Sequence, residues 1–356
     1  MSKDPVARLT ELLDMVIAEG GSDLHISAGT NPIIRVSGAL VPIVQQDPFS
    51  AEETAALLNA IIPPQRKATF EQEQAIDFSY AHKKDAGRFR VNGYTTQGTI
   101  ALAMRLIPRE VGTLETLNLP PVLEVFTQRT QGFFLVVGPV GQGKSTTLAA
   151  MLKRINEARA EHIVTIEDPV EYIFTPKKSL IHQREVRIDS PDFHTALQGA
   201  FREDVNVIMV GEMRDQETIS SAVTAAETGH LVLSTLHTNN AAQTIDRIID
   251  LFPASQQGQV RVQLAGSLAG IFSQRLIPRI AGGLVPAYEL LINNSAIANL
   301  IREGRTHEIT TVIQTSSQEG MVDMDRSLAE LVRRGEVTVE HAYERALDPK
   351  TFERYL

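Results

Sequence analysis

The chain has 356 residues, of which 43% are hydrophobic and 22% charged, with a formal net charge of −9. This composition is typical of a globular protein with room for two domains. Because the chain has no cysteine, disulfides, cysteine nucleophiles and cysteine-based zinc sites are excluded, and a reducing compartment fits. The acidic balance argues against a general nucleic-acid binder.

The sequence contains no membrane-spanning pattern. No run of about 18 uncharged apolar residues occurs. The N-terminal segment carries acidic side chains where a signal peptide would have an apolar core. We therefore expect any contact with a membrane to be peripheral. The acidic residues of that segment are Asp4, Glu11, Asp14 and Glu19.

Residues 1–106 predict a small α+β domain. Apolar residues at helical spacing predict a helix over 5–19, which Gly20-Gly21 would end. Alternating segments predict strands, two of them joined as a hairpin through Ser37-Gly38. A second helix should stop at Pro63-Pro64. The strands are expected at 23–26, 33–36, 40–43, 75–80, 88–94 and 99–106, and the second helix at 51–62.

The segment 107–121 is rich in proline and predicts a linker. Beyond it, apolar strand-like runs alternate with helical stretches, as in a parallel sheet covered by helices. The fold class is therefore α/β, with a core over 122–294 and a helical region over 295–356. The strands are expected at 133–137, 163–166, 207–210 and 231–235.

Residues 138–145 (GPVGQGKS) fit the phosphate-binding pattern G-x-x-x-x-G-K-[ST], between an apolar strand and a helix-prone run over 145–158. The glycines let backbone N–H groups turn toward a triphosphate. Lys144 supplies positive charge near the β- and γ-phosphates, and Ser145 offers a hydroxyl to Mg²⁺. The alternative is a glycine-rich turn that binds nothing, but the lysine, the serine and the flanking elements favour nucleotide binding.

Two apolar strands end in acidic residues. One closes in Glu167-Asp168-Pro169 and the other in Gly211-Glu212. Open α/β sheets bind their ligands at the carboxyl ends of the strands. One carboxylate could hold Mg²⁺ through water, and another could orient or deprotonate the attacking water. For either carboxylate alone, a solvated loop position remains the alternative.

His237 follows the strand at 231–235 and could sense the γ-phosphate, although a lone histidine is more often packed or at the surface. The remaining histidines show no metal-ligand spacing, and we expect no zinc. Arg88 and Arg90 share one side of a strand, and Arg105 follows on another. The residues alone favour solvated edge-strand charges. The functional alternative is arginine fingers from another domain or subunit.

Several segments in this order resemble the secretion ATPase superfamily of type II and type IV secretion and type IV pili. They are the loop at 138–145, the aspartate box at 165–172, the stretch at 183–186, the Walker B block at 210–215 and the histidine box at 229–239. The resemblance covers most of the chain, from about residue 20 to about residue 350.

Within the superfamily, the chain most resembles the pilus retraction (PilT-like) ATPases. It opens with Gly20–His25 as they do, is short, lacks a four-cysteine zinc element, and carries a segment similar to a retraction-associated helix at 296–303. It departs from the pattern at Ala298, where arginine is usual, at Val205-Asn206, where Pro-Asp is usual, and at Arg187, where glycine is usual. An accessory (PilU-like) ring subunit or a secretion or assembly ATPase therefore stays open.

The resemblance implies a PAS-like N-terminal α+β domain, a RecA-like ATPase domain and a helical C-terminus. It implies ATP and Mg²⁺, a homo-hexamer in the cytoplasm at the inner face of the inner membrane, and an inner-membrane pilus platform protein and a paralogous retraction ATPase as partners. Nucleic acid is not expected, because the charge balance disfavours a RecA-like nucleic-acid motor.

The resemblance also implies roles for individual residues. Glu167 would be the general base, Glu212 would support Mg²⁺ or the same water, and His237 would read the γ-phosphate. Arg90 and Arg105 would reach the nucleotide from the N-terminal domain. The expected phosphate and Mg²⁺ contacts are Gly138, Pro139, Val140, Gly141, Gln142, Gly143, Lys144, Ser145 and Thr146, with Ser145 and Glu212 at the metal.

Overall fold

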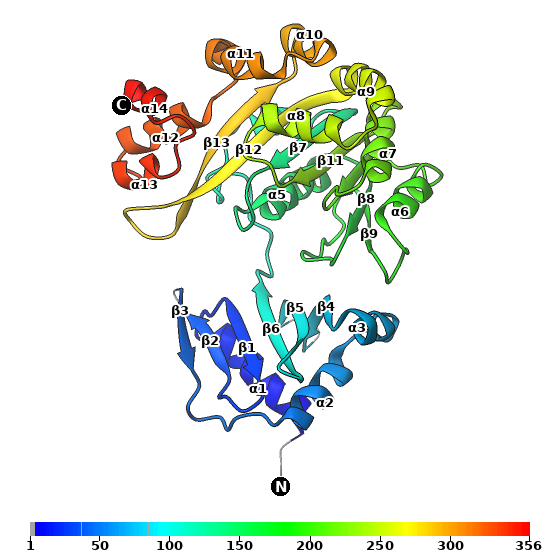
Figure 1. Ribbon diagram of the computed structural model, residues 1–356, viewed down its shortest axis with the longest axis vertical. Coiled ribbons are helices and arrows are strands. Elements are labelled where there is room, and N and C mark those ends of the chain that lie inside the picture. Colours follow the sequence, from blue (N-terminus) through cyan, green and yellow to red (C-terminus); the bar gives the residue numbers. More distant parts are fainter. Residues whose placement is uncertain (1–3, 37, 84–85) are drawn as a thin grey trace. The chain divides into compact units, whose positions relative to one another are not determined.

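The computed structural model describes residues 4–36, 38–83 and 86–356 and divides the chain into two compact units, shown in Figure 1. Unit 1 holds the chain up to Glu110 together with two later segments, Glu167–Ile173 and Arg184–Asp192. Unit 2 holds the rest. The break after Glu110 falls inside the segment 107–121 that we expect to be a linker.

Unit 1 is built on a six-stranded sheet in the order β3-β2-β1-β6-β5-β4, in which all neighbours run antiparallel. The six expected strands are confirmed, with ends that differ by two residues at most. Ser37, the first residue of the expected hairpin turn, lies outside the described residues. The strands are β1 (Asp23–Ser27), β2 (Ile33–Val36), β3 (Ala39–Pro42), β4 (Ala75–His82), β5 (Gly87–Thr96) and β6 (Thr99–Ile107).

The two expected helices of unit 1 are α1 (Pro5–Ala18) and α2 (Ala51–Ile61). α1 presents Leu9, Leu12 and Val16 to the core, all fully buried. Ser50 and Glu53 form a reciprocal capping box at the start of α2. The prolines after α2 end it, but Pro64 also opens a turn, η1 (Pro64–Arg66), and an unexpected helix, α3 (Lys67–Glu73). Proline favours a first helical position, so it both stops and starts helices here.

Unit 2 contains a seven-stranded sheet in the order β13-β12-β7-β11-β10-β8-β9. β12, β7, β11, β10 and β8 are parallel neighbours, and β13 runs antiparallel to β12. β7, β10 and β11 are buried along their whole length, as expected for parallel strands covered on both faces. The strands are β7 (Gly132–Val137), β8 (His162–Glu167), β9 (Leu180–Glu185), β10 (Val207–Val210), β11 (Leu231–Leu236), β12 (Leu268–Pro278) and β13 (Leu284–Ile292).

Helices surround this sheet, and none in the described part of the chain is long and apolar enough to cross a bilayer. The region after residue 295 is helical as expected, apart from a bridge between Val322 and Leu290. α12 packs against β13, beside which Figure 1 draws the last helices in red. The helices are α4 (Leu123–Thr127), α5 (Lys144–Ala158), α6 (Phe193–Ala200), α7 (Gln216–Glu227), α8 (Ala241–Asp250), α9 (Ala254–Ser267), α10 (Ser295–Glu303), η2 (Thr306–Glu308), α11 (Ile309–Thr315), η3 (Ser317–Glu319), α12 (Met324–Arg333), α13 (Val339–Tyr343) and α14 (Pro349–Tyr355).

A buried carboxylate on β13 holds the start of α8. Glu289 is 3% exposed, and its Oε1 accepts the Ala241 N–H at 2.7 Å. Burial, aided by the nearby carboxylates of Asp323 and Asp325, raises the pKa of Glu289 to about 7, although the Ala241 hydrogen bond and the charge of Arg275 oppose the shift. Glu289 is therefore about half protonated in the folded protein at neutral pH, where an ordinary glutamate is ionised.

We predict that the wild-type protein loses stability relative to Glu289→Gln as the pH rises from about 5 to about 8. The folded-state pKa of about 7 lies above the usual 4.5, so stability is fully present below the unfolded pKa and is lost as the pH rises through the folded one. The whole shift is worth roughly 3 kcal/mol. Urea unfolding of both proteins measures the difference, and a pH-independent difference would contradict the prediction.

Candidate active site at the carboxyl edge of the unit 2 sheet

The loop after β7 turns tightly at three glycines. Gly138, Gly141 and Gly143 have φ angles of +147°, +78° and +77°, a region that favours glycine. A Cβ atom at Gly138 would lie 2.4 Å from the Gln274 carbonyl oxygen, so only glycine fits against β12 there. Gly143 immediately precedes α5, whose first N–H groups have no partner within the helix and can bind an anion.

Two glutamines fasten this loop to β12. Gln274 Nε2 donates to the Gln142 carbonyl at 2.8 Å, and Gln142 Oε1 accepts the Leu276 N–H at 2.7 Å. Gln274 Oε1 also accepts the Thr147 hydroxyl of α5 at 2.6 Å. Gln274, which is 3% exposed, is not among the residues that the sequence predicts for this site. An uncharged polar side chain inside the largely apolar run at 268–277 is the signal that could have identified it.

The ammonium group of Lys144 is bonded to its own loop. Its Nζ donates to the carbonyls of Gly138 at 2.9 Å and Pro139 at 2.8 Å, and to Nδ1 of His237 at 3.1 Å. Lys144 is 7% exposed, and burial lowers its pKa to about 8. Pro139 has no N–H to offer a phosphate, so its contribution here is the carbonyl that holds the lysine.

His237 connects Lys144 with Glu212. Because Nδ1 accepts from Lys144, the neutral ring carries its proton on Nε2, which lies 3.6 Å from Glu212 Oε2. Burial, followed by the charge of Lys144, holds the pKa of His237 below its usual value and favours this neutral form. The imidazole of His237 thus connects the ammonium group of Lys144 with the carboxylate of Glu212.

Contacts to both neighbouring strands fix the position of Glu212. The Gly211 N–H donates to the Ile166 carbonyl on β8 at 2.8 Å, and the Gly211 carbonyl accepts the Thr235 hydroxyl on β11 at 2.6 Å. One Glu212 oxygen pairs with Arg214, whose side chain is 76% exposed, so that pair adds little stability. The carboxylate itself is 19% exposed.

The other predicted loop residues differ in exposure. Val140 is 79% exposed, so its side chain adds nothing to the packing of the loop. Ser145 and Thr146 lie in the first turn of α5, with Ser145 exposed. Ser145 and Glu212 supply a hydroxyl and a carboxylate, which are oxygen donors of the kind that Mg²⁺ prefers.

The predicted arginines lie in unit 1. Arg90 on β5 and Arg105 on β6 are directly opposite each other in the antiparallel register. Arg90 donates to Glu171 at 3.1 Å, and Arg105 donates to Asp23 at 2.9 Å. β5 lies between β4 and β6, so the interpretation of Arg88 and Arg90 as edge-strand charges is wrong. Their strand is internal because β4 continues the sheet beyond it.

Glu167, the predicted general base, ends β8 and is 8% exposed. It belongs to unit 1, together with Arg90 and Arg105. The structure therefore brings Lys144, Glu212 and His237 together within unit 2.

The three positions that depart from the expected family pattern have different local environments. Asn206 precedes β10, at the end opposite Glu212; its Oδ1 accepts the His162 N–H at 2.8 Å, a bond that aspartate could also make. Ala298 is 8% exposed within α10, which packs against α9. Arg187 has a φ of +66°, a conformation that costs a non-glycine residue about 1 kcal/mol and that glycine adopts without this strain.

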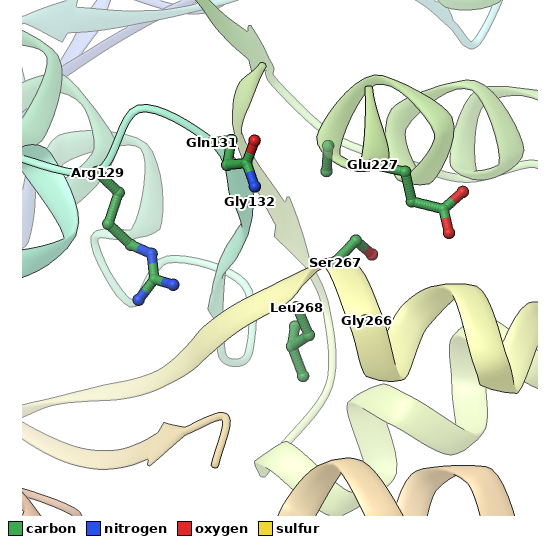
Figure 2. Close-up of a pocket in the computed structure, with 8 residues that line it drawn as sticks. Arg129, Gln131, Gly132, Glu227, Gly266, Ser267 and Leu268 are labelled. Atoms are coloured by element: carbon green, nitrogen blue, oxygen red, sulfur yellow. The ribbon is translucent and has the colours of Figure 1, made fainter. Parts of the chain in front are cut away.

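A pocket of about 280 Å³ opens at the other edge of the sheet, where β7 and β12 begin (Figure 2). Arg129 and Glu227 extend from opposite sides of it in that view, and both are exposed. The Ser267 hydroxyl donates to the Gln263 carbonyl at 2.8 Å and is already engaged. This pocket lacks the convergent polar groups that surround Lys144.

Comparison with known proteins identifies relatives along nearly the whole chain. A family model described as type II/IV secretion system protein matches residues 2–283. The type IV pilus retraction ATPase PilT of Pseudomonas aeruginosa is 44% identical over 97% of this chain and 99% of the relative. A twitching motility protein of Neisseria gonorrhoeae is 46% identical over 88% and 84%. The type IV pilus ATPase PilU of P. aeruginosa is 38% identical over 93% and 87%.

Solved structures show the same fold. A crystal structure of the pilus retraction motor PilT with bound ADP matches with a TM-score of 0.88 at 44% identity, over 97% of this chain and 98% of that one. The ATPase DotB of Legionella pneumophila matches with a TM-score of 0.84 at 26% identity, over 97% and 96%.

Nucleotide binding should take up about half a proton per site at about pH 8. Lys144 has a pKa of about 8 in the free protein, and a polyphosphate partner would raise it by favouring the ammonium form. Calorimetric titrations in two buffers with different ionisation enthalpies measure this uptake. The uptake should rise toward one proton at about pH 9, and no uptake at either pH would contradict the prediction.

Replacing Gln274 by methionine should weaken nucleotide binding about tenfold. The change leaves the Thr147 hydroxyl and the Gln142 carbonyl without their partner, so β12 no longer holds the loop. Titration with a fluorescent ATP analogue measures the dissociation constant. The matched control is Gln263→Met, which removes a half-buried glutamine of α9 that donates to Glu227 and has no contact with the loop. Equal dissociation constants for the two variants would refute the role of Gln274.

Proposed function

Because this chain belongs to the type II/IV secretion system protein family, we propose that it is an ATP-hydrolysing motor that drives the retraction of type IV pili. The proposal rests on the side-chain contacts that connect Lys144 through His237 to Glu212, beside the glycine loop and the N-terminus of α5. These are the parts with which a P-loop enzyme binds and cleaves a nucleoside triphosphate. The pilus role is supported by relatives named as a retraction ATPase and a twitching motility protein.

ATP binding exchanges one set of Lys144 partners for another. In the free protein, two carbonyls and an imidazole bind the ammonium group. The β- and γ-phosphates offer it full negative charges, which are stronger partners. The N–H groups from Gly141 to Thr146 and the N-terminal dipole of α5 act on the same phosphates.

We assign Mg²⁺ to the Ser145 hydroxyl and the Glu212 carboxylate. These two residues come from the start of α5 and from the end of β10, and their oxygens suit the ion. When bound, Mg²⁺ neutralises charge on the phosphate oxygens.

Hydrolysis requires a base for the attacking water. We assign this role to Glu167, which would accept a proton as the water oxygen bonds to the γ-phosphorus and the bond to the β-phosphate oxygen breaks, giving ADP and phosphate. His237, once Lys144 has left its Nδ1, would contact the γ-phosphate. Arg90 and Arg105 would stabilise the charge that develops on the phosphate oxygens.

We extend the proposal to the assembly. Unit 1 is assigned as PAS-like and unit 2 as RecA-like, and six copies are proposed to form a ring in the cytoplasm at the inner face of the inner membrane. The ring would act on an inner-membrane platform protein, and a paralogous retraction ATPase could join it. The family resemblance supports these assignments.

Purified protein tests the enzymatic proposal. Lys144→Ala and Glu212→Ala should each reduce phosphate release from ATP by about 100-fold or more. Glu217→Ala, an exposed carboxylate in the first turn of α7, is the matched control and should keep wild-type turnover. Unchanged turnover in both site variants would refute the mechanism. A wild-type protein that binds ATP but never releases phosphate would be an accessory subunit instead.

Live cells test the biological role. Deletion of the gene should abolish retraction events, counted on labelled pili, while pili are still assembled. Complementation with Lys144→Ala should fail, and complementation with Glu217→Ala should succeed. Retraction at a normal rate in the deletion strain would contradict the proposed role.

A further inference from the structure

Arg66 is a buried cation that joins two separate segments of unit 1. It ends η1, and its side chain is 1% exposed. Its Nη2 donates to Asp168 Oδ1 at 2.7 Å and to the Val186 carbonyl at 2.9 Å. Asp168 belongs to the segment Glu167–Ile173 and Val186 to the segment Arg184–Asp192, both of which are part of unit 1.

These bonds hold the backbone of Glu167 from two sides. Asp168 is the next residue in the chain, so its ion pair with Arg66 fixes the peptide that follows Glu167. The Val186 N–H donates to the Glu167 carbonyl at 2.8 Å, and the Val186 carbonyl accepts from Arg66. One guanidinium nitrogen therefore binds the side chain of the residue after Glu167 and the carbonyl of Val186, whose N–H donates to Glu167.

A second set of contacts keeps the following residues in place. Glu185 Oε2 accepts the Val170 N–H at 3.1 Å and the Ser79 hydroxyl at 3.2 Å. Arg88 Nε donates to the Val170 carbonyl at 3.1 Å. The turn after Glu167 is thus bonded to β4 and β5, and Arg66 supplies its attachment nearest to Glu167.

The buried arginine costs stability. Arg66 Nε has no hydrogen-bond partner in the described part of the chain, and an unsatisfied buried donor costs about 1–3 kcal/mol. A well-packed apolar side chain would avoid that cost. Groups kept at such a cost are concentrated at functional sites.

We propose that Arg66 is a positioning residue for hydrolysis, which holds the Glu167 carboxylate where it meets the attacking water. The inference rests on the proposed function, in which Glu167 is the base. Misplacing a catalytic group by about 1 Å can cost about 100-fold in rate. Arg66 therefore acts on turnover and leaves ATP binding to the Lys144 loop.

The test compares kcat and KM for ATP in Arg66→Ala, Arg66→Lys, Glu167→Gln and the double variant Arg66→Ala/Glu167→Gln. The matched control is Arg8→Ala. Arg8 is 6% exposed in the same unit and also donates to one carboxylate, Glu53 at 3.3 Å, and one carbonyl, Asp47 at 2.6 Å. Arg8→Ala therefore shows what the loss of a buried arginine does in general, and the difference from Arg66→Ala is the effect specific to Arg66.

We expect Arg66→Ala to lower kcat about 10- to 100-fold, with KM changed less than about twofold. Arg66→Lys should recover part of the rate, because both bonds come from one nitrogen and an ammonium group has three donors. Arg8→Ala should lower the melting temperature and keep kcat. In the Glu167→Gln background, measured by single turnover, Arg66→Ala should slow the reaction no further.

Either of two results would overturn this inference and leave the proposed function intact. One is an equal kcat in Arg66→Ala and Arg8→Ala. The other is an equal loss of rate from Arg66→Ala in the wild-type and Glu167→Gln backgrounds. Wild-type turnover in Glu167→Gln would overturn both this inference and the role of Glu167 in the proposed function. That result can be told apart from the other two, because it is measured in Glu167→Gln, which keeps Arg66.

Discussion

The parallel pairing of β7, β11 and β10 is the constraint on which the candidate site depends. Val137 is in register with Leu236, and Val210 with Ser234. The residues that follow these pairs therefore leave the sheet at one edge, where Lys144, His237 and Glu212 meet. A slip of one residue between β11 and β10 would turn every side chain of the slipped strand to the other face. The register observed between these strands therefore sets the geometry of the polar site.

Charged side chains that are buried at a cost in stability recur at or beside the positions to which we assign chemistry. Lys144 is satisfied without ligand, and its lowered pKa records the cost of burial. A nucleotide must displace these partners, which lowers its affinity but leaves a loop that is already folded before binding. Arg66 shows the same pattern in unit 1, where a buried guanidinium with an unused Nε binds the segment next to Glu167. In both cases, stability is lost locally to hold a reactive group in place.

The sequence predicted the parts of this protein that short-range patterns determine. The glycine loop, the central strands and the acidic strand ends follow from local composition. Because the carboxyl ends of parallel strands meet at one edge of the sheet, Glu212 and His237 could then be placed near Lys144. The contacts of Gln274 and Arg66 could not be predicted, because their partners lie 127 and 102 residues away in the chain. β12 was missed because Gly270, Ser273 and Gln274 interrupt its apolar run. β5 is predicted as an edge strand because its pairing with β4 is not visible in the sequence. The departures at Asn206 and Arg187 became interpretable only from the hydrogen bonds and backbone angles at those positions.

A structure of the protein with Mg²⁺ and a non-hydrolysable ATP analogue would show whether the nucleotide replaces the present partners of Lys144. We expect Lys144 Nζ to leave the Gly138 and Pro139 carbonyls and His237 Nδ1 and to lie within hydrogen-bonding distance of the β- and γ-phosphates. Glu167 should then be within reach of a water in line with the γ-phosphorus. A nucleotide bound elsewhere, or a Lys144 that keeps its present partners with the nucleotide in place, would contradict the account.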